Sequence, residues 1–364
     1  MRTRTALIGA TAVAVVVAAV VLGTRVAGVW GGSESTTFER AVRMAPAESQ
    51  RYAWTDWAGA RRELGARVDA DSTPREVGAF LDDAFTADLS SSSGLIDSTP
   101  MLQEKFGWSP ASIDWELLAQ STSGAVEIVG LPADLDIDEL ADQVRALGYT
   151  PPSSPDGVWE GGEERLAAAA QGTDSDGTAA PTLENIAFLR DRHLLLVSDS
   201  ADYLRTVLKG LDDTAATPVD DAAAGLVDAA GADPLAAVVY SGDYTCRTLA
   251  MAQADEQSQR QADQLIAAAG TVTPVTSFAM GLEADRSVRV VMGFERDDQA
   301  RENADSRAAL ASGPAPGQGG DFADRFTLGP VEATGKLVTM VLRPQPDTFV
   351  LSDLSTGPVL FATC

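Results

Sequence analysis

The sequence predicts an α+β fold: an N-terminal transmembrane helix followed by two units of antiparallel sheet with helices on one face. Three observations support this prediction. A long apolar run lies near the N-terminus, amphipathic helical segments alternate with short strands throughout, and strands followed by helices recur in a similar order after residue 235. We interpret the recurrence as a duplicated α+β unit.

Residues 6–22 (ALIGATAVAVVVAAVVL) contain no charged side chain. A helix of this length spans roughly 26 Å, slightly less than a hydrocarbon core of about 30 Å. The run is therefore either an uncleaved membrane anchor, which we favour, or a signal peptide cut before Val29. Arg2 and Arg4 precede it, which keeps the N-terminus inside and places the remainder outside the cytoplasm.

Shifts in composition divide the chain into five segments. A Gly/Ser/Thr-rich stalk follows the anchor, and an Ala/Asp/Gly-rich stretch separates the two units. The predicted segments are the tip and anchor (1–30), the stalk (31–50), the first α+β unit (51–211), a linker (212–234) and the second α+β unit (235–364).

Helical and alternating apolar spacing predicts the elements of the first unit and of the segment before it. Thr73 followed by Pro74 is a typical helix start. The predicted elements are helix 37–44, strand 52–57, helix 58–68, a helix from Thr73 through Phe85, strand 125–131, helix 134–147, a helix at 163–170 in a long loop, a hairpin of strands 186–189 and 193–197, and a helix from 199 to 211.

The linker and the second unit follow from the same patterns. The predicted elements are a modest helix near 219–230, strand 236–240, helix 246–269, strands 278–283 and 288–295, helix 298–311, strands 326–334 and 336–343, and a short helix or coil up to residue 364.

The formal net charge of −26, from 53 acidic and 27 basic residues, excludes several partners. Nucleic-acid binding needs a cationic surface, so we expect no nucleic-acid partner. Binding of the acidic body to anionic lipid is equally unfavourable. The expected contact with the membrane is therefore the N-terminal helix alone.

The chain has two cysteines, Cys246 and Cys364. Outside the cytoplasm an isolated pair is most simply an intramolecular disulfide, and we predict one here. Two free thiols or an intermolecular bridge are the alternatives. The closed loop would stabilise the fold by roughly 4–5 kcal/mol in chain-entropy models.

Sequence signatures of catalysis are missing. His193 is the only histidine, at the mouth of a predicted hairpin strand, and G-x-S-x-G does not occur. A phosphate-binding G-x-x-x-x-G-K-[ST] loop and a strand-anchored G-x-G-x-x-G are also missing. Zinc is disfavoured because the few His and Cys residues are scattered. We therefore expect no cofactor and no metal, and we favour a binding protein over an enzyme.

Residues 134–138 (DLDID) have the acid spacing of a calcium loop. The glycine position is held by Glu139 and the twelfth position by Arg145, so a capped helix start fits better. A second acidic turn at residues 174–177 offers a weaker calcium contact.

Two segments alternate tryptophan with acids: WTDW at 54–57 and DWE at 114–116. On a strand, Trp54 and Asp56 would share one face, whereas Asp114 and Glu116 would lie opposite Trp115. Aromatic side chains beside carboxylates are typical of carbohydrate-binding clefts and of two-carboxylate glycosidases. The alternative is core aromatics with solvated acids. The candidate ligand-binding residues are Trp54, Asp56, Trp57, Asp114, Trp115 and Glu116.

Four segments, YAWTDW, FGWSPASIDWEL, LRDRHLLLVSDS and VLSDLSTGPVLFATC, resemble membrane-anchored or secreted proteins of unknown function from high-GC Gram-positive bacteria. The resemblance implies a location in the cell envelope and supplies no activity.

The leading hypothesis is a non-catalytic, membrane-tethered extracytoplasmic binding or scaffolding protein with an unidentified envelope ligand or protein partner. The first alternative is an envelope carbohydrate-binding protein or glycoside hydrolase that uses the Trp/acid segments. A further alternative places a ligand site between the two units.

Overall fold

The computed structural model describes residues 35–173, 179–212, 221–231 and 233–364. Thr37–Cys364 form one compact unit. The predicted anchor or signal peptide, the acidic turn at 174–177 and part of the predicted linker lie outside the described residues. In the part of the chain that is described, no helix has both the length and the apolar character needed to cross a membrane.

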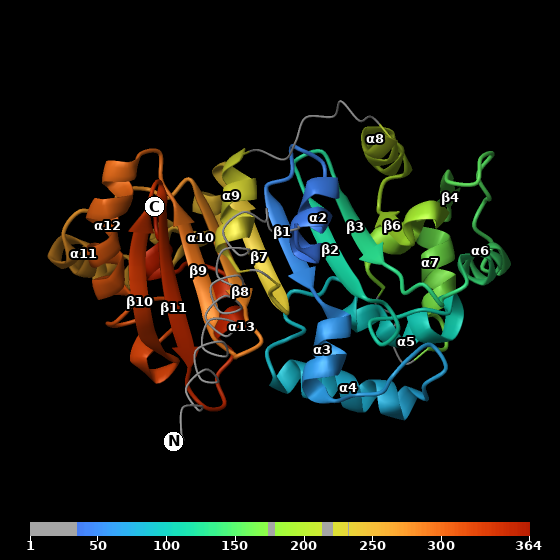
Figure 1. Ribbon diagram of the computed structural model, residues 1–364, viewed down its shortest axis with the longest axis horizontal. Coiled ribbons are helices and arrows are strands. Elements are labelled where there is room, and N and C mark those ends of the chain that lie inside the picture. The colour runs from blue at the N-terminus through green and yellow to red at the C-terminus, as the bar shows by residue number, and fades with distance from the viewer. Residues whose placement is uncertain (1–34, 174–178, 213–220, 232) are drawn as a thin grey trace, which may run out of the picture. The chain divides into compact units, whose positions relative to one another are not determined.

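A single antiparallel sheet of eleven strands runs through both predicted units and confirms the α+β class (Figure 1). Its order is β10-β11-β9-β8-β7-β1-β2-β3-β6-β5-β4, and the central β1–β7 pair joins the two halves. The strands are β1 (Arg51–Thr55), β2 (Trp115–Gln120), β3 (Ala125–Gly130), β4 (Val158–Glu160), β5 (Asn185–Leu189), β6 (Leu194–Ser198), β7 (Ala236–Ser241), β8 (Ser277–Leu282), β9 (Val288–Gly293), β10 (Phe326–Thr334) and β11 (Leu337–Pro344).

Apart from β4 at one edge, the strands of the two halves follow corresponding orders outward from the β1–β7 pair. Strands β1, β2, β3, β6 and β5 occupy the places that β7, β8, β9, β11 and β10 occupy in the second half. Strands β2 and β8 have equal length, as do β3 and β9. The first residue of β2, Trp115, pairs with the last of β3, Gly130, and in the second half Ser277 of β8 pairs with Gly293 of β9 in the same way. Aligning these strands end to end therefore matches each residue of one half with one residue of the other.

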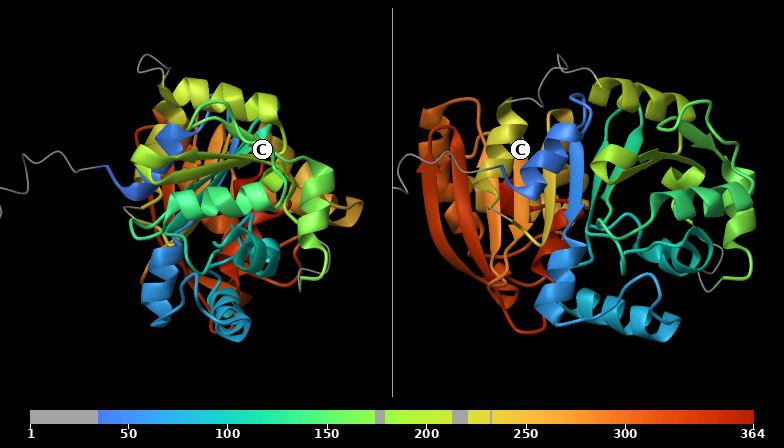
Figure 2. Two further views of the ribbon diagram at one scale, coloured as in Figure 1. Left: turned by 90° about the vertical axis from the view of Figure 1, so that its right-hand side faces the viewer. Right: turned by 45° about the vertical axis from the view of Figure 1, so that its right-hand side comes forward.

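Helices cover both faces of the sheet, which corrects the expectation of helices on one face (Figures 1 and 2). The central strands β7 and β8 are buried at nearly every position. Continuous apolar strands of this kind need cover on both sides. One face is covered by α2 (Thr37–Met44), α8 (Ala201–Asp212) and α9 (Asp221–Ala229).

The opposite face carries most of the other helices, and α4 begins at the predicted cap, where Thr73 and Glu76 form a reciprocal capping box. The remaining helices are α3 (Trp57–Leu64), α4 (Pro74–Thr86), α5 (Thr99–Met101), α6 (Ile137–Ala146), α7 (Glu163–Ala170), α10 (Asp243–Leu249), α11 (Glu256–Ala269), α12 (Asp297–Leu310) and α13 (Val350–Ser355).

Three elements differ from the prediction. Strands β2 and β4 were not predicted as strands. The helix predicted over 246–269 is two helices, α10 and α11, separated by a 3-10 turn at Met251–Gln253. Asp255 caps α11 by accepting from the amides of Gln257 and Ser258. Because aspartate favours the position before the first helical residue, a new helix begins here and the predicted helix is divided in two.

The C-terminal segment is held at two points. The predicted disulfide between Cys246 and Cys364 is present, with 5.7 Å between the Cα atoms. Beside it Arg307, on α12, is fully buried and donates to the carbonyl oxygens of Phe361 and Thr363, at 2.9 and 2.7 Å, and to that of Thr273. Burial lowers the pKa of Arg307 to about 10, so the guanidinium stays charged and binds three chain segments together.

Replacing Arg307 with lysine is expected to lower the free energy of unfolding by about 2 kcal/mol, because one ammonium group cannot reach all the carbonyls that the planar guanidinium reaches. Urea unfolding followed by circular dichroism measures the change. Arg301→Lys, at an exposed site on the same helix, is the control. Equal midpoints for the two variants would contradict the assigned role.

Candidate functional site

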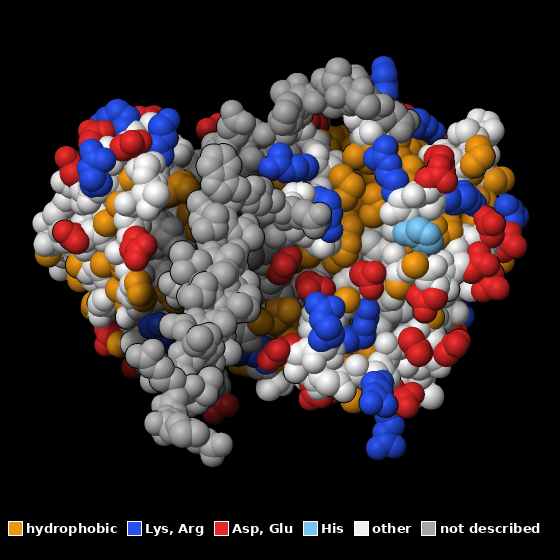
Figure 3. Space-filling model, in the orientation of Figure 1, with side chains coloured by type: hydrophobic (Ala, Val, Ile, Leu, Met, Phe, Trp, Pro, Cys, Tyr) orange, Lys and Arg blue, Asp and Glu red, His pale blue; other side chains and the backbone are white. Residues whose placement is uncertain are grey.

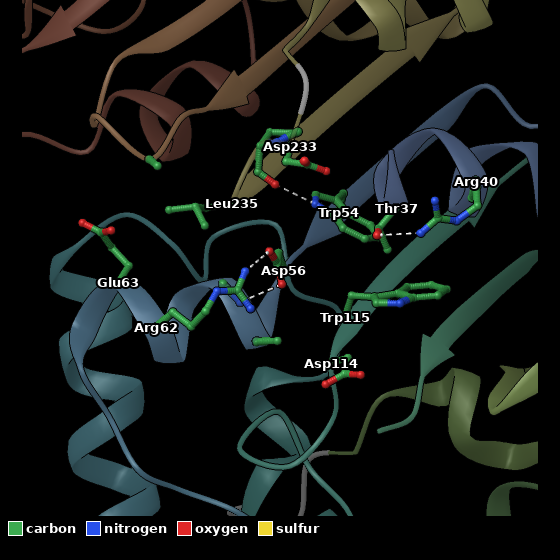
Figure 4. Close-up of a pocket in the computed structure, with 14 residues that line it drawn as sticks. Thr37, Arg40, Trp54, Asp56, Arg62, Glu63, Asp114, Trp115, Asp233 and Leu235 are labelled. Carbon is green, nitrogen blue, oxygen red and sulfur yellow. Dashed lines mark hydrogen bonds and ion pairs between the residues drawn. The ribbon is translucent and has the colours of Figure 1, made fainter. Parts of the chain in front are cut away.

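A pocket of about 750 Å³ opens where the two halves of the sheet meet (Figure 4). Its first-half walls come from α2, from the end of β1 with the start of α3, and from the start of β2. The second half contributes the segment before β7 and the turn after β8. Its lining includes Trp54, Asp56, Arg62, Asp114, Trp115 and Pro234.

Two tryptophans from neighbouring strands form the aromatic wall of the pocket. The rings of Trp54 and Trp115 stack with centroids 5.4 Å apart, and Phe38 packs behind Trp54 at 5.3 Å. Trp54 is 2% exposed and its indole N–H donates to the carbonyl of Pro234 at 2.9 Å. Trp115 stays partly exposed. Its ring lies over Gly130, where a Cβ atom would clash with the indole.

Asp56 has a structural role at the pocket wall. Its carboxylate caps α3 by accepting from the amide of Gly59 at 2.7 Å, and it pairs with Arg62 at 3.4 Å. Burial raises the pKa of Asp56, and these two partners offset the effect only in part. The cap replaces the predicted strand at 56–57, because an aspartate that binds the amide three residues later favours a helix start.

Asp114 lies at the pocket just before β2 and pairs with Arg61 at 3.7 Å. Arg61 also donates to the carbonyls of Pro110 and Ala111. Burial raises the pKa of Asp114, whereas the charge of Arg61 lowers it. Four acids line the pocket: Asp56, Glu63, Asp114 and Asp233. The first three pair with arginines, Glu63 with Arg286 at 3.8 Å.

The structure brings four of the six candidate ligand-binding residues to the pocket: Trp54, Asp56, Asp114 and Trp115. The expectation that Asp114 lies opposite Trp115 was wrong, because Asp114 precedes the strand. Trp57 and Glu116 are fully buried and belong to the opposite side of the sheet. They cannot line the same cleft as Trp115.

Glu116 meets a second buried carboxyl group, that of Glu127 on β3, which we had not considered from sequence. The two glutamates are 0% and 1% exposed. Burial raises the pKa of Glu116 to about 7, and burial together with Glu116 raises that of Glu127 well above its usual value. The signal in the sequence was a lone acid in the apolar strand AVEIVG, where an alternating pattern places it on a core face.

His193 is exposed at the turn between β5 and β6, as the single pale blue side chain in Figure 3 shows. It lines a shallow pocket of about 390 Å³ with Asp134, Asp136 and Asp138. Asp136 caps α6 and Asp138 pairs with Arg190 at 3.0 Å, as expected for a helix start. Among the described residues, no group of three or more His, Cys, Asp or Glu side chains is arranged to hold a metal ion.

No protein-family model matches the chain, and no curated protein or solved structure matches it either. The site is therefore interpreted from its own geometry.

Proposed function

We propose that this chain is a non-catalytic, membrane-tethered binding protein of the cell envelope that takes a carbohydrate in the pocket at Trp115. The carrying observation is a partly exposed indole, backed by Trp54, on the wall of a 750 Å³ pocket with charged groups around it. Flat apolar rings with polar groups nearby suit a ligand that has both a C–H face and hydroxyl groups.

The ion pairs made by the carboxylates that line the pocket favour carbohydrate binding over glycoside hydrolysis. A glycosidase needs two carboxyl groups free to act on opposite sides of one bond. Asp56 caps α3 and pairs with Arg62, Asp114 pairs with Arg61, and Glu63 pairs with Arg286. Among the described residues that line the pocket, Asp233 is then the one acid without an ion pair, whereas a glycosidase needs two. These engagements support a recognition role for the pocket.

The disulfide supports an extracytoplasmic location, because such bonds persist in oxidising compartments. The apolar run at 6–22, together with Arg2 and Arg4, supports tethering with the N-terminus inside. We further infer that the two halves derive from one duplicated unit. The aromatic wall of the pocket is then particular to the first half, since Ser277 occupies the position that corresponds to Trp115.

The test is calorimetric titration of the full chain in detergent with oligosaccharides of hexoses, pentoses and N-acetylhexosamines. Trp115→Ala should weaken binding by about tenfold or more, and Trp115→Phe should recover part of it. Phe85→Ala removes an aromatic ring that is 61% exposed on α4 and should bind as the wild type does.

Failure of every saccharide to bind the wild type, or equal binding by Trp115→Ala, would refute the proposal. Release of new reducing ends that depends on Asp114 would establish the hydrolase instead.

A further inference from the structure

The buried glutamate pair is incompletely partnered. Both side-chain oxygens of Glu116 and one of Glu127 lack a hydrogen-bond partner, and so does the indole N–H of Trp57. The side chains of Ser93 and Trp57 and the backbone of Gly94 lie near enough to Glu116 to lower its pKa as hydrogen-bonding groups, but burial outweighs them. Neither glutamate forms an ion pair with a described residue, and the charge that favours an ionised Glu127 is that of Arg51 on β1.

The fold does not require acids at these positions. Aligning β2 with β8 and β3 with β9 places Glu116 where Phe278 lies and Glu127 where Val290 lies. Both counterparts are fully buried in the apolar core. The second half forms the same sheet with apolar side chains at these two positions. Burying two carboxyl groups in the first half costs free energy, and the architecture of the sheet does not explain why they are there.

The surroundings of the pair are rich in hydroxyl oxygens. Thr55 is the direct cross-strand neighbour of Glu116 and bonds to Ser92 at 3.1 Å. Thr182 donates to Glu127 at 3.5 Å. Above them runs the SSSSG segment at 90–94, where a Cβ atom on the exposed Gly94 would lie 2.8 Å from Glu127 Oε1. Glu127 therefore lies directly against this loop, whose Gly94 is exposed to solvent.

We propose that Glu116 and Glu127 bind one divalent cation, Ca²⁺ above others, with the neighbouring hydroxyl groups as further oxygen ligands. Two carboxylates neutralise the charge of the ion, and the unpartnered oxygens supply its ligands. Ca²⁺ accepts irregular sets of oxygen ligands, whereas Mg²⁺ requires near-octahedral geometry. The ion would enter past Gly94. This site is independent of the pocket at Trp115, which lies on the other side of the sheet.

The test is thermal unfolding of the full chain in detergent at pH 7.5, first in EDTA and then with Ca²⁺ or Mg²⁺ alone. Saturating Ca²⁺, at about 100 times its dissociation constant, should raise Tm by about 5 °C. Glu116→Gln/Glu127→Gln should abolish the shift. Asp134→Asn/Asp138→Asn, which removes two exposed charges, should keep it, and Mg²⁺ should need at least tenfold higher concentration.

Terbium luminescence gives a second measurement that does not depend on stability. Tb³⁺ replaces Ca²⁺ at oxygen sites and emits when a nearby indole is excited. Emission should be competed by Ca²⁺ and lost in Trp57→Phe, while that variant keeps the Ca²⁺ shift in Tm. No Ca²⁺ shift in the wild type, or an equal shift in the double glutamine variant, would overturn the proposal.

Discussion

Replacing Cys246 and Cys364 with serine is expected to lower the free energy of unfolding by about 4–5 kcal/mol, the largest effect of any change considered. The two cysteines are 118 residues apart in sequence. Chain-entropy models assign that much stabilisation to a loop of this length, since the crosslink restricts the unfolded chain. The bond also joins the C-terminal segment to α10, so Leu360 and Phe361 are expected to loosen with it.

Urea unfolding with and without reductant measures this loss. Reductant should shift the wild type toward the variant and leave the variant unchanged, so each protein serves as a control for the other. A variant with the midpoint of the oxidised wild type would show that Arg307 and core packing hold the segment without the crosslink.

Much of the fold could be predicted from local patterns, and the errors have local causes. Strands 125–131 and 236–240 were found from their apolar runs, and the helix after Thr73 from its apolar spacing together with the Thr73–Pro74 start. Strand β2 was missed although Trp115, Leu117 and Ala119 form an uninterrupted apolar face, because Glu116 on the other face is charged in sequence and yet buried in the structure. The joining of both halves into one sheet depends on the β1–β7 pair, whose partners lie far apart in sequence.

The candidate site was predictable in kind but not in arrangement. The Trp/acid segments did indicate four residues that line one pocket. Glu116 lies opposite Trp115, as alternation along a strand predicts. The helix that begins after Asp56, where a continued strand was expected, was not predicted. The meeting of Glu116 with Glu127 depends on the register between β2 and β3, where Glu127 pairs with Leu118, two residues beyond Glu116. A single sequence does not reveal that register.

In EDTA, the titration of Glu116 is expected to lower the stability of the wild type by about 3 kcal/mol as pH rises from about 4.5 to about 7. Glu116 has a pKa of about 7 in the folded chain against 4.5 when unfolded. Over that interval the folded state binds more protons than the unfolded state, so rising pH favours unfolding. Glu127, whose pKa is raised further by burial and by Glu116, extends the decline above pH 7.

Glu116→Gln/Glu127→Gln removes this titration, so its stability should change less over the same range and exceed that of the wild type at pH 8 in EDTA. Asp88 has a pKa raised by burial to about 6 and accepts from the amides of Leu351 and Ser352. It lowers stability with rising pH in both proteins, so the difference between their urea midpoints isolates the glutamate pair.

Ca²⁺ distinguishes the two ways of neutralising this pair. If protons alone neutralise it, the wild-type decline is the same with and without the ion. If Ca²⁺ binds, it should remove most of the decline above pH 6 in the wild type and leave the double glutamine variant unchanged, because the ion replaces protons that the carboxylates would otherwise keep. Parallel pH profiles for the wild type and the variant in EDTA would show that the pair is hydrated and ionised, and the burial argument would fail.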